Sequence, residues 1–187
     1  MNWINANLHG DSFLNFIFAF ITNSGNTGFI WIILSLVFML FKKTRKCGFI
    51  MFVSLGVSFV LVDMILKPLI LRPRPFFVDS DLMPFIKSSG VEIPTSSSFP
   101  SGHSSSSLAT SFALFFYNKK WGKPAVFYGF LVAISRVYFG VHYPTDVLAG
   151  ILIGVLVAYV VNIIAKKLEN FYLKKRGVIK IRDYIST

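Results

Sequence analysis

Three short stretches of an otherwise apolar chain carry residues suited to acid–base and nucleophilic chemistry. They read KPLILRPRP at 67–75, PSGH at 100–103 and SRVYFGVHYPTD at 135–146. The first and third stretches carry more cations than carboxylates, among them Lys67, Arg74 and Arg136. Arginine can hold two phosphate oxygens at once, and such a group of cations therefore predicts an oxyanion site, with phosphate as the best match.

The PSGH stretch has the composition of a helix start. Ser101 is suited to cap the helix N-terminus, and Gly102 allows an anion to approach the backbone. The free N–H groups and the positive dipole end of such a terminus attract phosphate. We therefore predict that Ser101 and Gly102 bind phosphate. For the serines at 104–107, helix packing, capping and lining of a wet pocket all stay open.

The two histidines of these stretches differ in their neighbours. Asp146 follows His142 closely enough to hold one imidazole nitrogen and leave the other free to attack phosphorus. His103 can then give a proton to the leaving oxygen and later take one from water. With three cations, these groups suffice for phosphoryl transfer without a metal, and no carboxylate cluster is present to hold magnesium. We predict neither a metal nor another cofactor.

Composition indicates a membrane protein. The 187 residues are 54% hydrophobic and only 14% charged, whereas soluble domains are about 45–50% apolar and roughly a quarter charged. The length predicts one domain spanning 1–187. The N-terminal apolar segment lacks the basic region of a signal peptide, so we interpret it as a retained membrane segment. The single Cys47 excludes an internal disulfide.

Six apolar segments predict an all-α, integral membrane six-helix bundle. They are roughly 11–23, 27–41, 48–66, 103–118, 124–139 and 147–165. A spanning helix needs about 20 apolar residues, a length that 48–66 and 147–165 approach most clearly.

The net charge of +11 is unevenly distributed along the chain. Fourteen of the nineteen basic residues lie in three segments: 42–46, 118–123 and the tail from 166 onward. Six crossings place all three segments on the same side of the membrane. The positive-inside rule makes this side cytoplasmic. The topology is therefore multi-pass in the cytoplasmic (inner) cell membrane, with both termini cytoplasmic and the three stretches at the extracytoplasmic ends of helices. The charge thus reads as an orientation signal, not as a nucleic-acid site.

Two further features belong to the same region. Asp63 precedes Lys67 by one helical turn, and an i,i+4 pair would neutralise and aim the lysine, so Asp63 is predicted to support the site. The loop 76–98 mixes aromatic and polar residues. It reads equally well as a flap over a lipid access path and as an ordinary amphipathic loop.

Taken together, the three stretches resemble the signature of the type 2 phosphatidic acid phosphatase superfamily. Its parts occur in order: Lys67, six residues and Arg74-Pro75; Pro100-Ser101-Gly102-His103; and Ser135-Arg136 with His142 and Asp146. A three-part match is far more specific than one short motif. The resemblance implies a six-helix membrane enzyme that hydrolyses lipid phosphates or diphosphates without a metal.

The resemblance also implies a role for each matching residue. His142 is the nucleophile that forms a phosphohistidine, Asp146 orients it, and His103 protonates the leaving group. The phosphate is held by the three cations, the Ser101 side chain and the Gly102 amide: Lys67, Arg74, Arg136, Ser101 and Gly102.

The predicted partners are a lipid phosphate substrate and the surrounding membrane lipids, with no nucleic acid and no evident protein partner. Undecaprenyl diphosphate is the first candidate substrate, by analogy with short bacterial members. Phosphatidylglycerol phosphate and phosphatidic acid are the alternatives. A non-catalytic lipid-phosphate binder or transporter is the second alternative, against which the two histidines and Asp146 speak, because binding alone needs only the cations.

Overall fold

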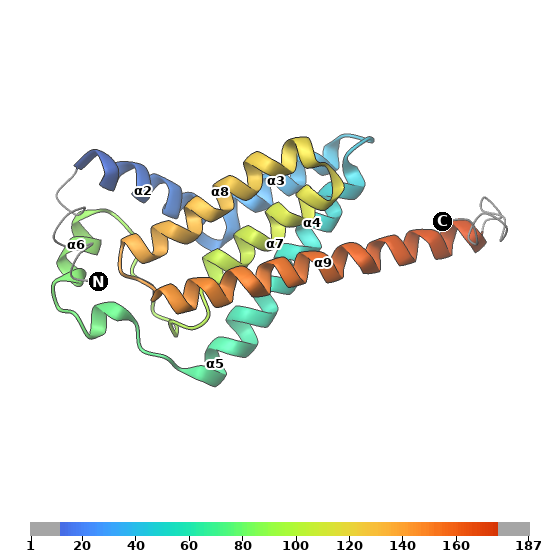
Figure 1. Cartoon of the computed structure of the whole chain (residues 1–187). Helices are drawn as coiled ribbons and strands as arrows, with labels where there is room; N and C mark the ends of the chain where they lie inside the picture. Colours follow the sequence, from blue (N-terminus) through green and yellow to red (C-terminus); the bar gives the residue numbers. More distant parts are fainter. Residues whose placement is uncertain (1–11, 176–187) are drawn as a thin grey trace.

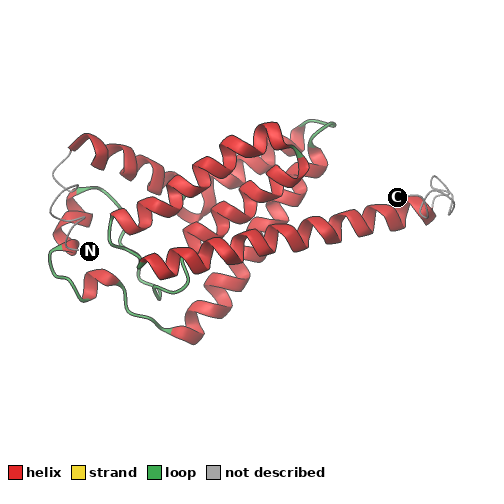
Figure 2. Cartoon of the chain, in the orientation of Figure 1, coloured by secondary structure: helices red, strands yellow, loops and turns green. Residues whose placement is uncertain are grey.

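The computed structural model describes residues 12–175, and in this range the chain forms helices and loops without a strand (Figure 2). In chain order, the α-helices are α2 (Ser12–Ser24), α3 (Phe29–Leu40), α4 (Arg45–Phe59), α5 (Lys67–Ile70), α6 (Leu82–Ser88), α7 (Gly102–Tyr117), α8 (Lys119–Tyr138) and α9 (Pro144–Lys175). Three short elements join them: the 3₁₀ turns η1 (Asn26–Gly28) and η3 (Pro75–Phe77), and the π-helix η2 (Val60–Leu66).

Each of the six predicted apolar segments coincides with a helix of the structure. The ranges Arg45–Phe77 and Pro144–Lys175 are long and apolar enough to cross a membrane, and the bent pair Ser12–Ser24 and Asn26–Leu40 would make a third span. Helices α3 and α7 have 12 and 16 residues, fewer than the roughly 20 that a crossing usually needs. The all-helical class is thus confirmed, and six crossings stay a prediction. The two chain ends, predicted to be cytoplasmic, lie outside the described residues.

Helix α9 is longer than the predicted segment 147–165, with 32 described residues. It begins at Pro144, a residue that suits the first turn of a helix because its missing N–H would have no partner there. His142 therefore precedes the helix, and Asp146 lies in its first turn. Leucines at a spacing of four residues stay exposed along α9, at 148, 152 and 156, as expected for a face that contacts lipid. The C-terminal half of α9 projects beyond the other helices (Figure 1).

Helix α7 lies at the centre of the bundle, packed against α4, α8 and α9 (Figure 1). Its contact with α9 is backbone to backbone, because a Cβ on Gly154 would lie 2.4 Å from the Ser105 carbonyl oxygen and one on Gly150 2.5 Å from that of Ser101. The Ser105 hydroxyl is 2.6 Å from Ser58 of α4, and Ser107 accepts from the Trp31 indole of α3 at 2.9 Å. Helix packing, one of the three open roles for the serines at 104–107, therefore holds for these two.

Two irregular turns bring side chains to one end of the bundle. Helices α2 and α3 are bent by 51° at η1, where Thr27 and Gly28 have φ of 52° and 71°. The π-helix η2 interrupts the long helix that α4 begins, and π-helical turns often occur at functional sites. These turns carry Asn26 in η1, Asp63 in η2 and Lys67 directly after it.

The loop 76–98 is partly helical and partly packed. Its first half contains α6 and buries Phe76, Leu82 and Ile86 against Tyr138 and Phe139, at the end of α8. The second half contributes the serines at 96–98 to the predicted site, as described below. The packing of the first half fits the interpretation of an ordinary amphipathic segment better than that of a flap.

Candidate active site

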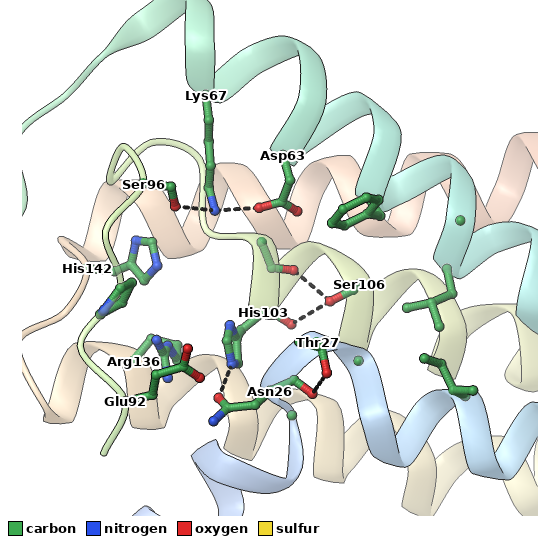
Figure 3. Close-up of a pocket in the computed structure, with 18 of the residues that line it drawn as sticks. Asn26, Thr27, Asp63, Lys67, Glu92, Ser96, His103, Ser106, Arg136 and His142 are labelled. Carbon is green, nitrogen blue, oxygen red and sulfur yellow. Dashed lines mark hydrogen bonds and ion pairs between the residues drawn. The ribbon is translucent and has the colours of Figure 1, made fainter. Parts of the chain in front are cut away.

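A cavity of about 520 Å³ opens where the three predicted stretches meet (Figure 3). Seven of the nine predicted site residues line it: Asp63, Lys67, Arg74, Gly102, His103, Arg136 and His142. They come from η2, α5, α7, α8 and the loops before α6 and α9. Ser101 and Asp146 are fully buried behind this wall. The tertiary structure therefore gathers residues that are up to 83 positions apart in the sequence.

The three cations are buried, and Lys67 and Arg74 are each held by more than one neighbouring oxygen. Lys67 donates to Asp63 at 2.5 Å, as the i,i+4 spacing predicted, and reaches the Ser96 hydroxyl at 3.5 Å. Arg74 donates to the carbonyl oxygens of Ser96 and Val141 at 2.7 and 2.8 Å. These contacts fix the two cations at the cavity wall before any substrate binds.

Arg136 differs from the other two cations in having an unused donor. Its Nη1 donates to the Thr22 hydroxyl on α2, whereas its buried Nε has no hydrogen-bond partner among residues 12–175. Glu92 lies beside it at the cavity (Figure 3). A buried N–H without a partner is costly, and a phosphate oxygen in the cavity is the kind of acceptor it lacks.

His142 is buried and presents an unprotonated nitrogen to the cavity. Arg74 lies 3.2 Å from His142 Nε2, and because a guanidinium can only donate, Nε2 must accept. The proton of the neutral ring is then on Nδ1, which lies 3.5 Å from Asp146 Oδ2. Burial lowers the pKa of His142 to about 3, an effect that nearby Arg74, Arg136 and Lys67 increase and the contact with Asp146 opposes. The ring is therefore neutral at physiological pH, and its unprotonated Nε2 accepts from Arg74 in this structure.

His103 is held more loosely than His142. It is the second residue of α7, and its Nε2 lies 2.9 Å from the Asn26 carboxamide oxygen, a contact with η1 (Figure 3). An amide oxygen can only accept, so this contact favours a proton on Nε2. The role of His103 as proton donor stays a prediction.

Ser101 and Gly102 form the predicted helix start, but their contacts differ from the prediction. The Ser101 hydroxyl caps α7 by accepting from the Ser104 N–H at 3.4 Å and its hydroxyl at 2.8 Å, and it does not line the cavity. A Cβ on Gly102 would lie 2.8 Å from Asp63 Oδ1. The anion that approaches Gly102 in this structure is thus the Asp63 carboxylate, and phosphate binding by Ser101 and Gly102 stays a prediction.

Several residues of the site were not predicted. Asp146 accepts from Arg72 and from the Ser98 hydroxyl, Arg74 contacts Ser96, and His103 contacts Asn26. Arg72 lies two positions before Arg74, and the serines stand directly before PSGH, so proximity to the motifs was the available signal. No such signal marks Asn26, which lies 77 positions from His103.

Metal ligands are not gathered in the part of the chain that the structure describes. In residues 12–175, no three His, Cys, Asp or Glu side chains lie close enough together to hold a metal ion. Cys47 is buried in α4 and belongs to the hydrophobic core. Independence from metals stays a prediction about the reaction.

Comparison with known families decides the classification. The model of the PAP2 superfamily matches residues 47–169, about two thirds of the chain. The chain belongs to the PAP2 superfamily. This match confirms the family predicted from the three motifs, and it covers α4 to most of α9, including every predicted site residue.

Relatives of this PAP2 protein include enzymes from bacteria and archaea. The chain is 29% identical over 154 residues to the undecaprenyl-diphosphatase BcrC of Bacillus subtilis, covering 81% of this chain and 75% of that one. It is 32% identical over 148 residues to an undecaprenyl-diphosphatase of Sulfolobus acidocaldarius, with coverage of 78% and 68%. The crystal structure of a transmembrane PAP2-type phosphatidylglycerolphosphate phosphatase from Bacillus subtilis superimposes with a TM-score of 0.67 at 29% identity, covering 87% of this chain and 82% of that one.

Proposed function

We propose that this PAP2 protein is a membrane lipid phosphatase or diphosphatase that acts through a phosphohistidine. Undecaprenyl diphosphate, hydrolysed to undecaprenyl phosphate and phosphate, is the first candidate substrate. The observation that carries this proposal is a single cavity with two chemically different ends. One end holds three cations and both histidines, and the other is walled by apolar side chains of α3 and α4: Ile32, Phe52, Leu55 and Phe59.

The first step transfers the phosphoryl group to the enzyme. Lys67, Arg74 and Arg136 hold the phosphate oxygens and stabilise the charge that develops on them. His142 Nε2 forms a bond to phosphorus while the bond from phosphorus to the leaving oxygen breaks. That oxygen takes a proton from His103, and the lipid product leaves, which is undecaprenyl phosphate for the first candidate substrate.

The second step regenerates the enzyme. Water attacks phosphorus and gives a proton to His103 as the bond from phosphorus to His142 Nε2 breaks. Asp146, near Nδ1, stabilises the positive ring while it carries the phosphoryl group. The products are inorganic phosphate and the free enzyme in its starting protonation state.

The choice among lipid phosphates rests on the relatives. Two of them are undecaprenyl-diphosphatases, which supports the first candidate. The structural neighbour is a phosphatidylglycerolphosphate phosphatase, which keeps phosphatidylglycerol phosphate as the alternative, together with phosphatidic acid. A non-catalytic binder or transporter is disfavoured by the unprotonated nitrogen of His142, for which binding alone has no use.

The proposed location is the extracytoplasmic face of the cytoplasmic membrane. The support is the charge distribution. The basic segment 42–46 connects α3 to α4, and Lys119, Lys120 and Lys123 lie at the start of α8, both at the end of the bundle opposite the cavity. By the positive-inside rule this end is cytoplasmic, and the cavity then faces outward.

Phosphate release by the purified full-length protein in detergent tests the reaction. The substrates are undecaprenyl diphosphate, phosphatidylglycerol phosphate and phosphatidic acid, each with and without EDTA. We expect release that survives EDTA and is abolished in His142→Ala, whereas Lys120→Ala, at an exposed lysine far from the cavity, serves as the matched control. Release that is unaffected by His142→Ala would overturn the proposal.

Gly56 offers a separate test of the apolar end. It lines the cavity, and a Cβ added to it meets no atom within 4 Å. Gly56→Phe should therefore fill the space proposed for the lipid chain and lower activity on undecaprenyl diphosphate about tenfold or more, while hydrolysis of a short water-soluble phosphate ester persists. Gly56→Ala is the control and should behave as wild type. Equal losses on both substrates would show that this end does not bind the lipid chain.

A further inference from the structure

The Asp146 carboxylate has more partners than the histidine it is expected to orient. Its Oδ1 accepts from Arg72 Nη1 at 2.6 Å, and its Oδ2 accepts from the Ser98 hydroxyl at 2.5 Å and the Tyr143 N–H at 3.0 Å. His142 Nδ1 is farther away, at 3.5 Å from Oδ2. The strongest ionic partner of the buried carboxylate is therefore Arg72, not the histidine.

Arg72 is fixed in place by Thr145 and Tyr143, which lie close to Asp146 in the sequence. Its Nη1 also donates to the Thr145 hydroxyl at 2.9 Å, and its guanidinium carbon lies 4.1 Å from the centre of the Tyr143 ring. The side chain is 35% exposed and does not line the cavity. Arg72 therefore cannot act on the phosphate by contact, and any influence on the reaction passes through Asp146.

We propose that Arg72 is a positioning residue that sets the lifetime of the phosphohistidine by neutralising Asp146. This inference rests on the proposed function. When Nε2 of His142 carries the phosphoryl group and Nδ1 keeps its proton, the ring is positively charged. A carboxylate with its full negative charge would stabilise that ring and slow the breaking of the bond between nitrogen and phosphorus. Arg72 shares the charge of Asp146 and so keeps the intermediate reactive.

The steps themselves stay those of the proposed reaction. Water supplies the oxygen, the electron pair of the nitrogen–phosphorus bond returns to Nε2, and the water proton goes to His103. Arg72 exchanges no proton and forms no covalent bond. Its contribution is its positive charge, which lies beside Oδ1 of Asp146, whereas His142 faces Oδ2.

The test measures the decay of the phosphoenzyme directly. Full-length protein in detergent is mixed with lipid substrate carrying radioactive phosphate, chased with unlabelled substrate and quenched in base, which preserves phosphohistidine. Arg72→Gln keeps a hydrogen-bond donor but removes the charge, and we expect the decay rate constant to fall about tenfold without a fall in the rate of formation. Arg72→Lys keeps the charge but loses the planar group that reaches both Thr145 and Asp146, so its decay rate should lie between those of Arg72→Gln and wild type.

A merely structural role would give a different pattern. It would lower formation and decay together in both variants, and that result, or an unchanged decay rate in Arg72→Gln, would overturn the inference. If Arg72→Gln fails to fold, Thr145→Val replaces it as the test variant, because it removes a hydrogen bond to the guanidinium and keeps the charge. Thr145→Val should slow decay of the phosphoenzyme by about twofold. Unchanged decay in Thr145→Val would equally count against the inference. Absence of any base-stable phosphoenzyme in active wild type would instead refute the proposed function.

Discussion

The two histidines of the cavity are held in contrasting ways. His142 is buried, receives Arg74 on one nitrogen and faces Asp146 with the other, and Asp146 is itself fixed by Arg72, Ser98 and a backbone N–H. Within residues 12–175, His103 makes one side-chain hydrogen bond, to the Asn26 carboxamide at the bend between α2 and α3. His142 is thus part of a network that joins the stretches 67–75 and 135–146 with Ser98, whereas His103 is held by a single contact from a distant part of the chain.

This difference matches what each group must do in the proposed reaction. A nucleophile has to meet phosphorus along one line, and fixing its direction lowers the entropic cost of reaction. A proton donor has to serve the leaving oxygen in one step and water in the next, at two positions. We infer that the network restricts His142, and that the single contact to Asn26 leaves His103 freedom to turn between the two positions.

The largest expected effect separates the two histidines by leaving group. His142→Ala should abolish hydrolysis of every substrate, because no other group can take the phosphoryl group. His103→Ala should slow release of the leaving group from a lipid phosphate by roughly 10²–10⁴-fold but spare the initial burst of nitrophenolate from nitrophenyl phosphate, whose leaving oxygen needs no proton. Steady turnover should fall on both substrates, because water gives its proton to His103 in the second step. Phosphate release and the nitrophenolate burst measure the two reactions, and loss of the burst in His103→Ala would refute its role as proton donor.

A smaller effect is expected at Asn26. Asn26→Leu removes the acceptor for His103 Nε2 and should lower kcat on lipid phosphate about tenfold, the value of one hydrogen bond in the transition state. The initial burst of nitrophenolate from nitrophenyl phosphate, which needs no proton from His103, should stay near that of wild type. Thr27→Ser, at the neighbouring position of the same bend, is the matched control. If Asn26→Leu depresses both substrates alike, the residue supports the fold of the bend and does not position His103.

The smallest effect concerns stability against acid. Because the pKa of His142 is lowered to about 3, the unfolded chain binds a proton below pH 6.5 that the folded chain does not bind. Stability should therefore fall as the pH decreases, by at most about 1.4 kcal/mol per pH unit from this group. Thermal unfolding in detergent between pH 7 and pH 5 measures the effect. His142→Gln cannot titrate at this position and should lose less stability than wild type over this pH range. Equal losses in the two proteins would show that His142 binds a proton as readily in the folded chain as in the unfolded chain.

Much of the site could be predicted because its residues stand in short motifs. Lys67 and Arg74 lie in one stretch and His142 and Asp146 in another, and a few residues of loop or helix restrict how far apart such neighbours can be. The pairing of Asp63 with Lys67 followed from helical spacing alone. The capping role predicted for Ser101 is found in the structure, whereas its phosphate binding stays a prediction, because a capping serine and a phosphate-binding serine have the same sequence pattern.

By itself, the sequence determined the residue types of the reaction, the apolar segments that become helices and the membership of the PAP2 superfamily. Only the tertiary structure decided which groups hold the two histidines: Arg72 behind Asp146, Ser98 beside it, and Asn26 against His103. The physical reason is that local spacing limits contacts between near neighbours, whereas contacts across 48 to 77 positions depend on how helices pack. The close approach of α7 to α9 at Gly150 and Gly154, and the bend at η1, are the packing features that bring these residues together.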